Sequence, residues 1–253
     1  MRNAAESFII AFSMYSRLPM PAVKWNDDNR RYVFAFFPFV GAVEGLIFYY
    51  LWILLDRIHC GALLTGALLT LFTILFTGGI HLDGFMDVRD ALASYRSVEE
   101  RLRILKDPHV GSFAVIWAVM LLIVKTAVYG SLSREILPLT AITFFLSRSL
   151  SALSVLGFPE AYKEGTAFSF KSAAAKSVKP LLIIFALLSF GAAFYISVRG
   201  AAVLLFLSAV LMICHYRNCT VNFGGINGDT AGCFLELFET AVPLIMVITE
   251  PVL

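Results

Sequence analysis

Long apolar runs separated by short polar segments dominate the pattern of this 253-residue chain. A helix needs about 20 apolar residues to cross a hydrocarbon core about 30 Å thick. The runs predict about seven transmembrane helices, bounded approximately by Val33–Leu55, Leu63–Thr77, Phe113–Gly130, Ile136–Leu156, Leu181–Val198, Ala201–His215 and Leu235 to the C-terminus. The second, sixth and last runs are short or carry charge, so we expect them to be tilted, partly re-entrant or covered by neighbours.

Composition supports the same fold class. Hydrophobic residues make up 59% of the chain and charged residues only 15%, whereas a soluble domain averages about 25% charged. No internal repeat or long linker divides the sequence. We therefore predict an all-α, polytopic helix bundle forming a single membrane-embedded domain, residues 1–253. The four cysteines show no CxxC pair, which gives no reason to expect structural zinc or a disulfide framework.

The distribution of lysine and arginine predicts the orientation. Of the 20 basic residues, 15 fall in the N-terminal segment and in loops on the same side of the predicted bundle, and 3 fall on the other side. The remaining two, Lys125 and Arg148, lie within predicted spans. Positively charged loops stay in the cytoplasm, so we expect a cytoplasmic N-terminus in the inner membrane of a prokaryotic cell. We expect the protein to be embedded in a lipid bilayer and to bind no nucleic acid.

Two polar segments, Gly78–Gly111 and Asn222–Glu239, lie on the predicted cytoplasmic side. In the first, Asp83, Asp87 and Asp90 have the i, i+4, i+7 spacing of one helix face. Carboxylates so placed repel each other unless a cation lies among them, and oxygen ligands without cysteine favour Mg²⁺, Mn²⁺ or Ca²⁺ over zinc. The alternative is a solvated acidic turn whose charge is balanced by nearby arginines.

Other residues of the first segment are candidates for catalysis or anion binding. His81 is either a structural hydrogen-bond donor or a general base, and it adjoins Gly78 and Gly79, which allow close backbone approach. Further along, Arg103 and Lys106 suit an anionic ligand such as a diphosphate. The alternative for such basic residues is anchoring at the membrane surface.

The second segment combines glycines with three carboxylates. Gly224, Gly225 and Gly228 form a flexible loop whose amides can cradle phosphate. Asp229 is expected to be the N-cap of the last helix. Glu236 and Glu239, at i and i+3, then share a face inside a span. A second metal-binding arm made of Asp229, Glu236 and Glu239 explains these carboxylates.

Three further charges, Glu44, Lys125 and Arg148, lie deeper in predicted spans. Ionisable residues inside a membrane are functional candidates, and pairing with one another explains them equally well. The segment Lys163–Lys179 mixes lysine with aromatic residues. It fits an amphipathic helix on anionic lipid or a flap over the site.

Four motifs resemble, in order, those of the cobalamin synthase family, the adenosylcobinamide-GDP ribazoletransferases. They are FFPFVGAVEG (Phe36–Gly45), GGIHLDGFMDVRDAL (Gly78–Leu92), ERLRILKDPHVGSFAV (Glu100–Val115) and GGINGDTAGCFLELFE (Gly224–Glu239). The resemblance spans nearly the whole chain. Arg89, Ala91 and Asn227 depart from the residues common in the family, but every carboxylate is kept.

The resemblance implies an Mg²⁺-dependent membrane enzyme of late cobalamin biosynthesis. It would join adenosylcobinamide-GDP to α-ribazole or its 5′-phosphate and release GMP. By position, the acidic motifs fall on Asp83, Asp87, Asp90, Asp229, Glu236 and Glu239 as metal ligands. His81, Asp87, Asp90, Lys106 and Asp107 are the expected catalytic residues, and Gly84, Gly111 and Asn227 join the substrate-binding set. A homo-oligomer, or association with other late-pathway enzymes, is left open.

Three alternatives remain at this point. CDP-alcohol phosphotransferases also use clustered aspartates, but here Ile80 stands where their first aspartate is expected and no Ala-Arg pair follows Asp83-Gly84. Prenyltransferases of the UbiA type use two DxxxD-like arms, of which only Asp83-x-x-x-Asp87 is present. A secondary transporter would use the intramembrane charges, but such proteins usually show repeated halves.

Overall fold

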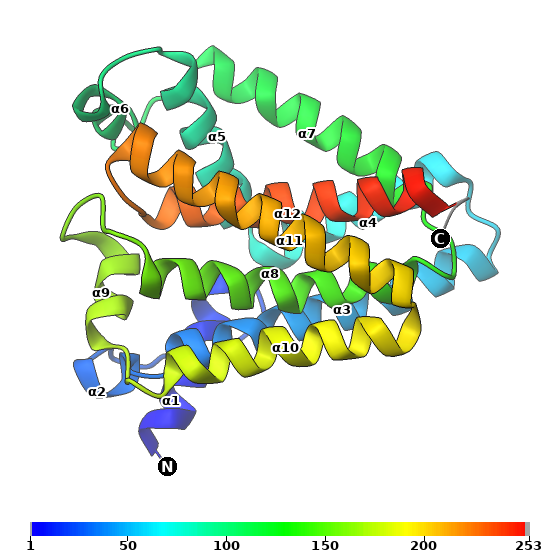
Figure 1. The fold of residues 1–253 in the computed structure, drawn as a ribbon, viewed down its shortest axis with the longest axis horizontal. Coiled ribbons are helices and arrows are strands. Elements are labelled where there is room, and N and C mark those ends of the chain that lie inside the picture. Colours follow the sequence, from blue (N-terminus) through cyan, green and yellow to red (C-terminus); the bar gives the residue numbers. More distant parts are fainter. Residues whose placement is uncertain (1, 251–253) are drawn as a thin grey trace.

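The computed structural model describes residues 2–250, and Figure 1 shows a bundle of helices. Apart from one isolated bridge between Glu160 and Ile226, these residues form no β-structure. The prediction of an all-α polytopic bundle is confirmed. The elements are α1 Arg2–Tyr15, α2 Asp27–Arg30, α3 Val33–Arg57, α4 Ala62–Thr77, α5 Ile80–Ala93, α6 Val98–Ile104, α7 Ser112–Gly130, α8 Leu137–Gly157, α9 Gly165–Ala173, α10 Val178–Ile196, α11 Val198–Arg217, the π-helical turn η1 Asn218–Asn222 and α12 Gly228–Thr249.

Among residues 2–250, six helical stretches are long and apolar enough to cross a membrane. They contain α3, α7, α8, α10, α11 with η1, and α12. The short run predicted at Leu63–Thr77 becomes α4, which turns by 95° into α5. Gly78 and Gly79 make this turn with φ of 68° and 79°, a left-handed conformation that costs glycine little. The last span begins at Gly228 rather than near Leu235, and its predicted end at residues 251–253 lies outside the described residues.

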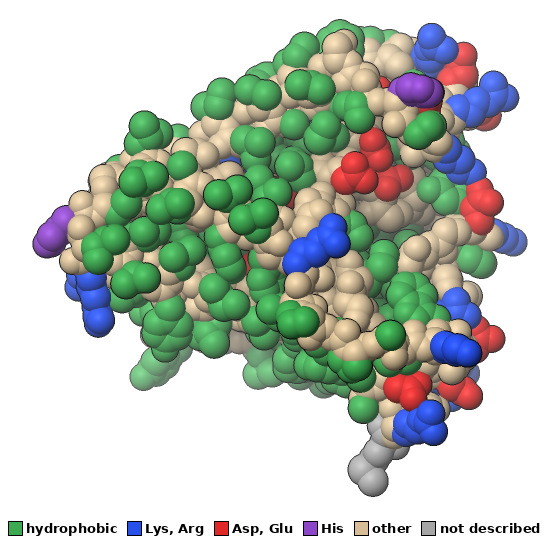
Figure 2. Space-filling view, turned by 180° about the vertical axis from the view of Figure 1, so that it is seen from behind, with side chains coloured by type: hydrophobic (Ala, Val, Ile, Leu, Met, Phe, Trp, Pro, Cys, Tyr) green, Lys and Arg blue, Asp and Glu red, His purple; other side chains and the backbone are tan. Residues whose placement is uncertain are grey.

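Glycines allow the closest helix contacts in the bundle. At Gly45 on α3, an added Cβ would meet the backbone of Ala141 on α8, so these two helices pack backbone to backbone as small residues permit in membranes. Around this centre, α4 packs on α7, α10 on α8, and α12 on both α5 and α8. The outward faces of α7 and α10 expose large apolar side chains, and Figure 2 shows a broad apolar surface between charged ends. This surface suits lipid.

The short helices α1, α2, α6 and α9 gather at the end of the bundle where the N-terminus lies, and the chain ends at the opposite end (Figure 1). The bend between α4 and α5 places α5 at the same end as α6. Most of the basic loop residues therefore lie at this end too. The direction of this end relative to the cytoplasm stays a prediction.

Candidate active site

The first acidic motif is helical, as its spacing predicted. Asp83, Asp87 and Asp90 all lie on α5. Asp83 is exposed, whereas Asp87 and Asp90 are half-buried. The carboxylate of Asp90 lies against Gly111, where any Cβ would collide with it. A side chain at position 111 would therefore have to displace the Asp90 carboxylate.

The second acidic motif begins α12, and here one prediction is wrong. The N-cap is Asn227, not Asp229. The Asn227 side chain accepts a hydrogen bond from the Thr230 amide at 2.8 Å, and the Thr230 hydroxyl accepts one from the Asn227 amide at 3.0 Å. Because this capping box satisfies the helix start, the Asp229 carboxylate does not have to serve as the cap.

The two acidic motifs meet where α5 crosses α12. A Cβ on Gly84 would lie 2.9 Å from the carbonyl oxygen and 3.0 Å from the Cα of Asp229, and one on Gly232 would lie 3.4 Å from the Cα of His81. The expected convergence of these distant segments is confirmed. Asp87 and Asp90 follow Asp83 at one-turn spacing along the same face of α5.

These four aspartates have no cation partner in the described structure. The ion pairs among residues 2–250 include none of Asp83, Asp87, Asp90 and Asp229. The nearby Arg89 guanidinium instead stacks on the rings of Phe85 and Trp117, at 5.1 and 4.8 Å from their centroids. The four carboxylates are therefore not neutralised by an ion pair with any side chain of the described residues.

The aspartates can supply part, but not all, of the ligand shell of a divalent cation. Within the described chain, no three His, Cys, Asp or Glu side chains converge as a complete metal cage. Mg²⁺ usually takes one or two carboxylates and completes its shell with water and substrate phosphates. Oxygen donors on α5 and at the start of α12, without cation partners, fit that mode of binding.

Glu236 and Glu239 lie elsewhere, and the structure does not place them with the aspartates. Glu236 accepts from the Lys125 ammonium at 2.7 Å. Glu239 accepts from the Arg148 guanidinium at 2.6 Å and from the Ser147 hydroxyl at 2.7 Å. Both glutamates face the interior, as predicted, but buried cations occupy them. Their assignment as a second metal-binding arm thus lacks support from the geometry.

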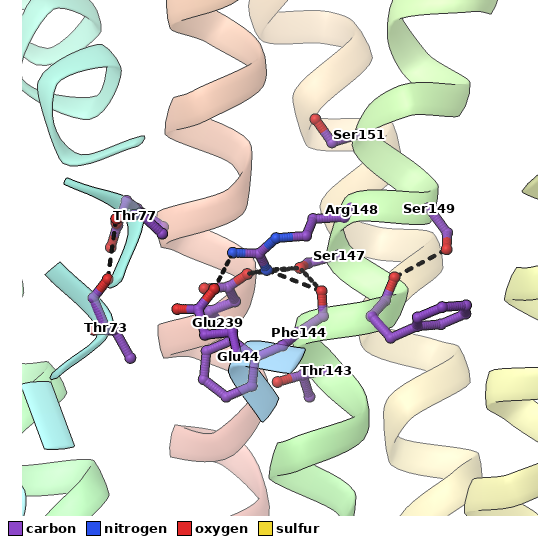
Figure 3. A network of polar contacts seen from close by, with 12 residues as sticks. Glu44, Thr73, Thr77, Thr143, Phe144, Ser147, Arg148, Ser149, Ser151 and Glu239 are labelled. Carbon is purple, nitrogen blue, oxygen red and sulfur yellow. Dashed lines mark hydrogen bonds and ion pairs between the residues drawn. The ribbon is translucent and has the colours of Figure 1, made fainter. Parts of the chain in front are cut away.

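The three deep charges noted in the sequence belong to this same network. Figure 3 shows Arg148 reaching toward both Glu44 and Glu239, and an ion pair joins Arg148 to each. The side chains of Glu44 and Arg148 are fully buried, and that of Lys125 is 1% exposed. Pairing with one another, rather than a separate transport pathway, accounts for their presence. The network ties α3, α7 and α8 to α12.

The α6–α7 loop lies at the rim of the site. Lys106 pairs with Glu164, and its ammonium lies 4.7 Å from the ring centroid of Tyr162. Asp107 accepts one hydrogen bond from the His109 amide at 3.0 Å and contacts the His109 ring nitrogen at 2.7 Å, and these contacts lower the pKa of its carboxyl. Arg103 is exposed. Lys106 and Asp107 are therefore accessible to a ligand rather than buried against the aspartates.

The predicted substrate-binding glycines have different surroundings. Gly78 packs on the Arg17 side chain, and Gly225 packs on the backbone of Glu160 and Ala161. Gly79 and Gly228 have open space around them, and Gly224 has φ of 67°. Only Gly228 of this set lines the cavity described next.

A cavity of about 310 Å³ opens beside the aspartates. Figure 2 shows carboxylates gathered in a hollow near the end rich in lysine and arginine. Asp83, Asp229, His81 and Asn227 line it, whereas Asp87 and Asp90 do not. Its other walls come from α1, α3, α8, α12 and the segment 160–171, with Met14, Tyr15, Phe34, Phe37, Ser151, Val155, Glu160, Tyr162, Glu164, Phe168, Lys171, Ile226, Ala231 and Leu235 among the lining residues. The segment 160–171 overlaps Lys163–Lys179, for which a flap over the site was one of the two alternatives, whereas the walls from α1, α3 and α8 were not foreseen from the sequence.

Burial divides the cavity into two parts. The deep part is formed by side chains with little exposure, such as Phe34, Phe37 and Val155. The mouth carries Asp83, Glu164 and Tyr162. Burial, together with the charges of Asp229 and Glu164, raises the pKa of the Tyr162 phenol to about 12. Tyr162 therefore stays neutral at physiological pH and serves as a hydrogen-bonding group.

Comparisons with known proteins agree with the geometry. The family model for cobalamin-5-phosphate synthase matches residues 7–247. The chain is 37% identical over 249 residues to the adenosylcobinamide-GDP ribazoletransferase of Lachnoclostridium phytofermentans, covering 98% of this chain and 95% of that protein. Proteins of the same name from Geobacillus kaustophilus and Clostridium botulinum are 33% and 31% identical, over 96% and 94% of this chain and 95% and 96% of theirs. No solved structure matches the chain.

Proposed function

The chain belongs to the cobalamin-5-phosphate synthase family, and we propose that it acts as an adenosylcobinamide-GDP ribazoletransferase. The observation that carries the proposal is the meeting of α5 and α12 at the mouth of a cavity. Four aspartates without cation partners lie at this crossing. Such a site suits a substrate that brings phosphates and a divalent cation together.

Magnesium fits this site better than a transition metal because all the donors are carboxylate oxygens. Asp83 and Asp229, which line the cavity, would hold it with Asp87 beside them. When bound, the ion supplies positive charge that neutralises the diphosphate and the departing phosphate. Lys106, exposed at the rim, is placed to bind phosphate oxygens once it exchanges its partner Glu164.

The reaction transfers the corrinoid-bearing phosphoryl group from GMP to an alcohol. The oxygen of a ribose hydroxyl that is free in both α-ribazole and its 5′-phosphate forms a bond to the corrinoid-side phosphorus of the diphosphate. The bond from that phosphorus to the bridging oxygen breaks, and GMP leaves with the electron pair. The hydroxyl proton passes to one of the carboxylates at the mouth. The chain's own residues position both partners and exclude water.

The apolar and basic surfaces of the bundle indicate how the protein sits in the membrane. The apolar faces of α7 and α10 fix the bundle in lipid, and the site lies at the end that carries most of the basic loops. We propose that this end faces the cytoplasm of a prokaryotic cell, by the positive-inside rule. The nucleotide-activated corrinoid would then reach the site from the inner leaflet.

The test uses the detergent-purified, full-length protein with adenosylcobinamide-GDP, α-ribazole and Mg²⁺, and measures GMP release. We expect GMP and the joined corrinoid from the wild type, and no turnover from Asp83→Asn or Asp229→Asn. Asp56→Asn is the matched control, because Asp56 pairs with Arg134 on the opposite end of the bundle. Release of CMP or pyrophosphate from other donors, with none of GMP, would overturn the proposal in favour of a different phosphotransferase or a prenyltransferase.

A further inference from the structure

The deep part of the cavity has a chemistry different from its mouth. Its buried wall is built from the rings of Phe34 and Phe37 and the aliphatic side chains of Val155 and Leu235. The His81 ring stacks near Tyr15, with centroids 6.2 Å apart. Aromatic and aliphatic walls of this kind bind a flat, largely apolar ring. The four acidic residues lining the cavity all lie outside the buried part.

Two buried polar side chains complete the deep part. The Asn227 amide nitrogen has no hydrogen-bond partner among the described residues, and neither has the His81 Nε2. Each side chain is only 4% exposed. A buried donor without a partner is costly, so a ligand that brings one acceptor atom is favoured here. Ser151, another polar lining residue, already donates to the Ala231 carbonyl at 3.4 Å.

Size excludes the larger substrate from this space. The cavity of about 310 Å³ is at the small end of ligand pockets, which span about 300–1,000 Å³. It can take one nucleoside but not a corrin ring with its side chains. The corrinoid must therefore lie outside, toward the mouth and the membrane.

Two nucleosides take part in the proposed reaction, guanosine and α-ribazole, and either is small enough for the deep part of the cavity. Guanine presents an N1–H and an amino group, and both need acceptors. Of the two unpaired side-chain atoms of the buried wall, the Asn227 amide nitrogen is a donor, so His81 Nε2 could accept from one of these groups but not from both. The benzimidazole of α-ribazole carries two methyl groups and has one free ring nitrogen, which is an acceptor only. Its apolar edge matches Phe34 and Val155, and its nitrogen matches the free Asn227 amide.

We propose that the deep part of the cavity is the acceptor subsite and holds the benzimidazole ring of α-ribazole. This inference rests on the proposed function and adds the location and the selectivity of one substrate. With the ring inside, the ribose points to the mouth, and its attacking hydroxyl lies beside Asp83 and Asp229. Guanine is left to the exposed polar rim around Glu160 and Glu164.

The test narrows the deep part with Val155→Phe and uses Val119→Phe as its control. Val119 lies on the outer face of α7 and is 50% exposed, so the same change there leaves the cavity intact. We expect Val155→Phe to raise the KM for α-ribazole about tenfold or more, as a mismatch of this size does in an apolar pocket. The KM for adenosylcobinamide-GDP should stay unchanged. The opposite pattern, with the KM raised for adenosylcobinamide-GDP alone, would overturn the inference.

A second variant, Val155→Ala, tests the acceptor subsite if Val155→Phe does not fold. In Val155→Ala the wall loses two methyl groups, so the preference for α-ribazole over the nucleoside of unsubstituted benzimidazole should fall about tenfold. A competition between the two acceptors gives this ratio independently of the amount of folded enzyme. An unchanged ratio contradicts the subsite. A wild type that joins no acceptor at all would instead refute the proposed function.

Discussion

Removing Arg148 should destabilise the bundle far more than removing an exposed arginine. Arg148 pairs with both Glu44 and Glu239, and the three side chains are 0 to 4% exposed. Arg148→Met leaves two buried carboxylates with Lys125 as the remaining cation of the network. Breaking a buried pair on one side costs about 3–5 kcal/mol. For a chain of this length, that corresponds to a fall in the melting temperature of about 6–20 °C.

The matched control is Arg134→Met at the opposite end of the bundle. Arg134 pairs with Asp56 at 2.6 Å, but the side chains are 73% and 37% exposed. Exposed ion pairs contribute about 0–1 kcal/mol, so the melting temperature of Arg134→Met should fall by no more than a few degrees. The measurement is thermal denaturation of both variants in the same detergent, followed by circular dichroism.

A rescue variant separates lost charge from lost packing. Glu44→Gln and Glu239→Gln, added to Arg148→Met, remove the uncompensated charges while keeping similar shapes. Because a buried network replaced as a whole is often tolerated, the triple variant should recover most of the loss. Equal melting temperatures for Arg148→Met and Arg134→Met would refute the view that this network holds the helices together.

Three further predictions concern the site. Gly84→Ala should lower turnover at least tenfold, because its Cβ would press on the α12 backbone at 2.9–3.0 Å; Gly191→Ala on α10, with nothing within 4 Å, should be neutral in the same GMP-release assay. Ultraviolet titration of the wild type against Tyr162→Phe should place the Tyr162 ionisation near pH 12 rather than 10. Because the pKa of Tyr162 is raised in the folded protein, its contribution to the free energy of unfolding is full below pH 10 and is lost as the pH rises toward 12. A difference spectrum that titrates near pH 10 would contradict the raised pKa. Lys106→Met should raise the KM for adenosylcobinamide-GDP about tenfold or more, since a hydrogen bond to a charged group contributes about 1.5–3 kcal/mol; an unchanged KM would remove Lys106 from the phosphate site.

Features that depend on local pattern were predicted well. Apolar run length identified the spanning helices, since lipid thickness alone sets that length. The i, i+4, i+7 spacing of the aspartates correctly predicted that this segment, α5, is a helix and that the three side chains share one of its faces. The cap of α12 was misassigned because both Asn227 and Asp229 are good capping residues. The capping box with Thr230, three residues after Asn227, is the local signal that distinguishes them.

Features that depend on distant partners were harder to predict. Glu236 and Glu239 have the spacing of a ligand pair, and nothing local reveals that Lys125 and Arg148 reach them from α7 and α8. The aromatic wall of the cavity was missed for the same reason. Tyr15, on α1, precedes the first long apolar run by almost twenty residues and meets His81 only in the folded bundle.

The most direct test of the central claim is binding of Mn²⁺, as a spectroscopic substitute for Mg²⁺, to the purified protein. Electron paramagnetic resonance reports the bound fraction without requiring turnover. With the diphosphate substrate present, we expect the wild type and Asp56→Asn to bind the ion, and Asp83→Asn and Asp229→Asn each to weaken binding at least tenfold. Equal binding by all four proteins would show that the aspartates of α5 and α12 do not share a cation.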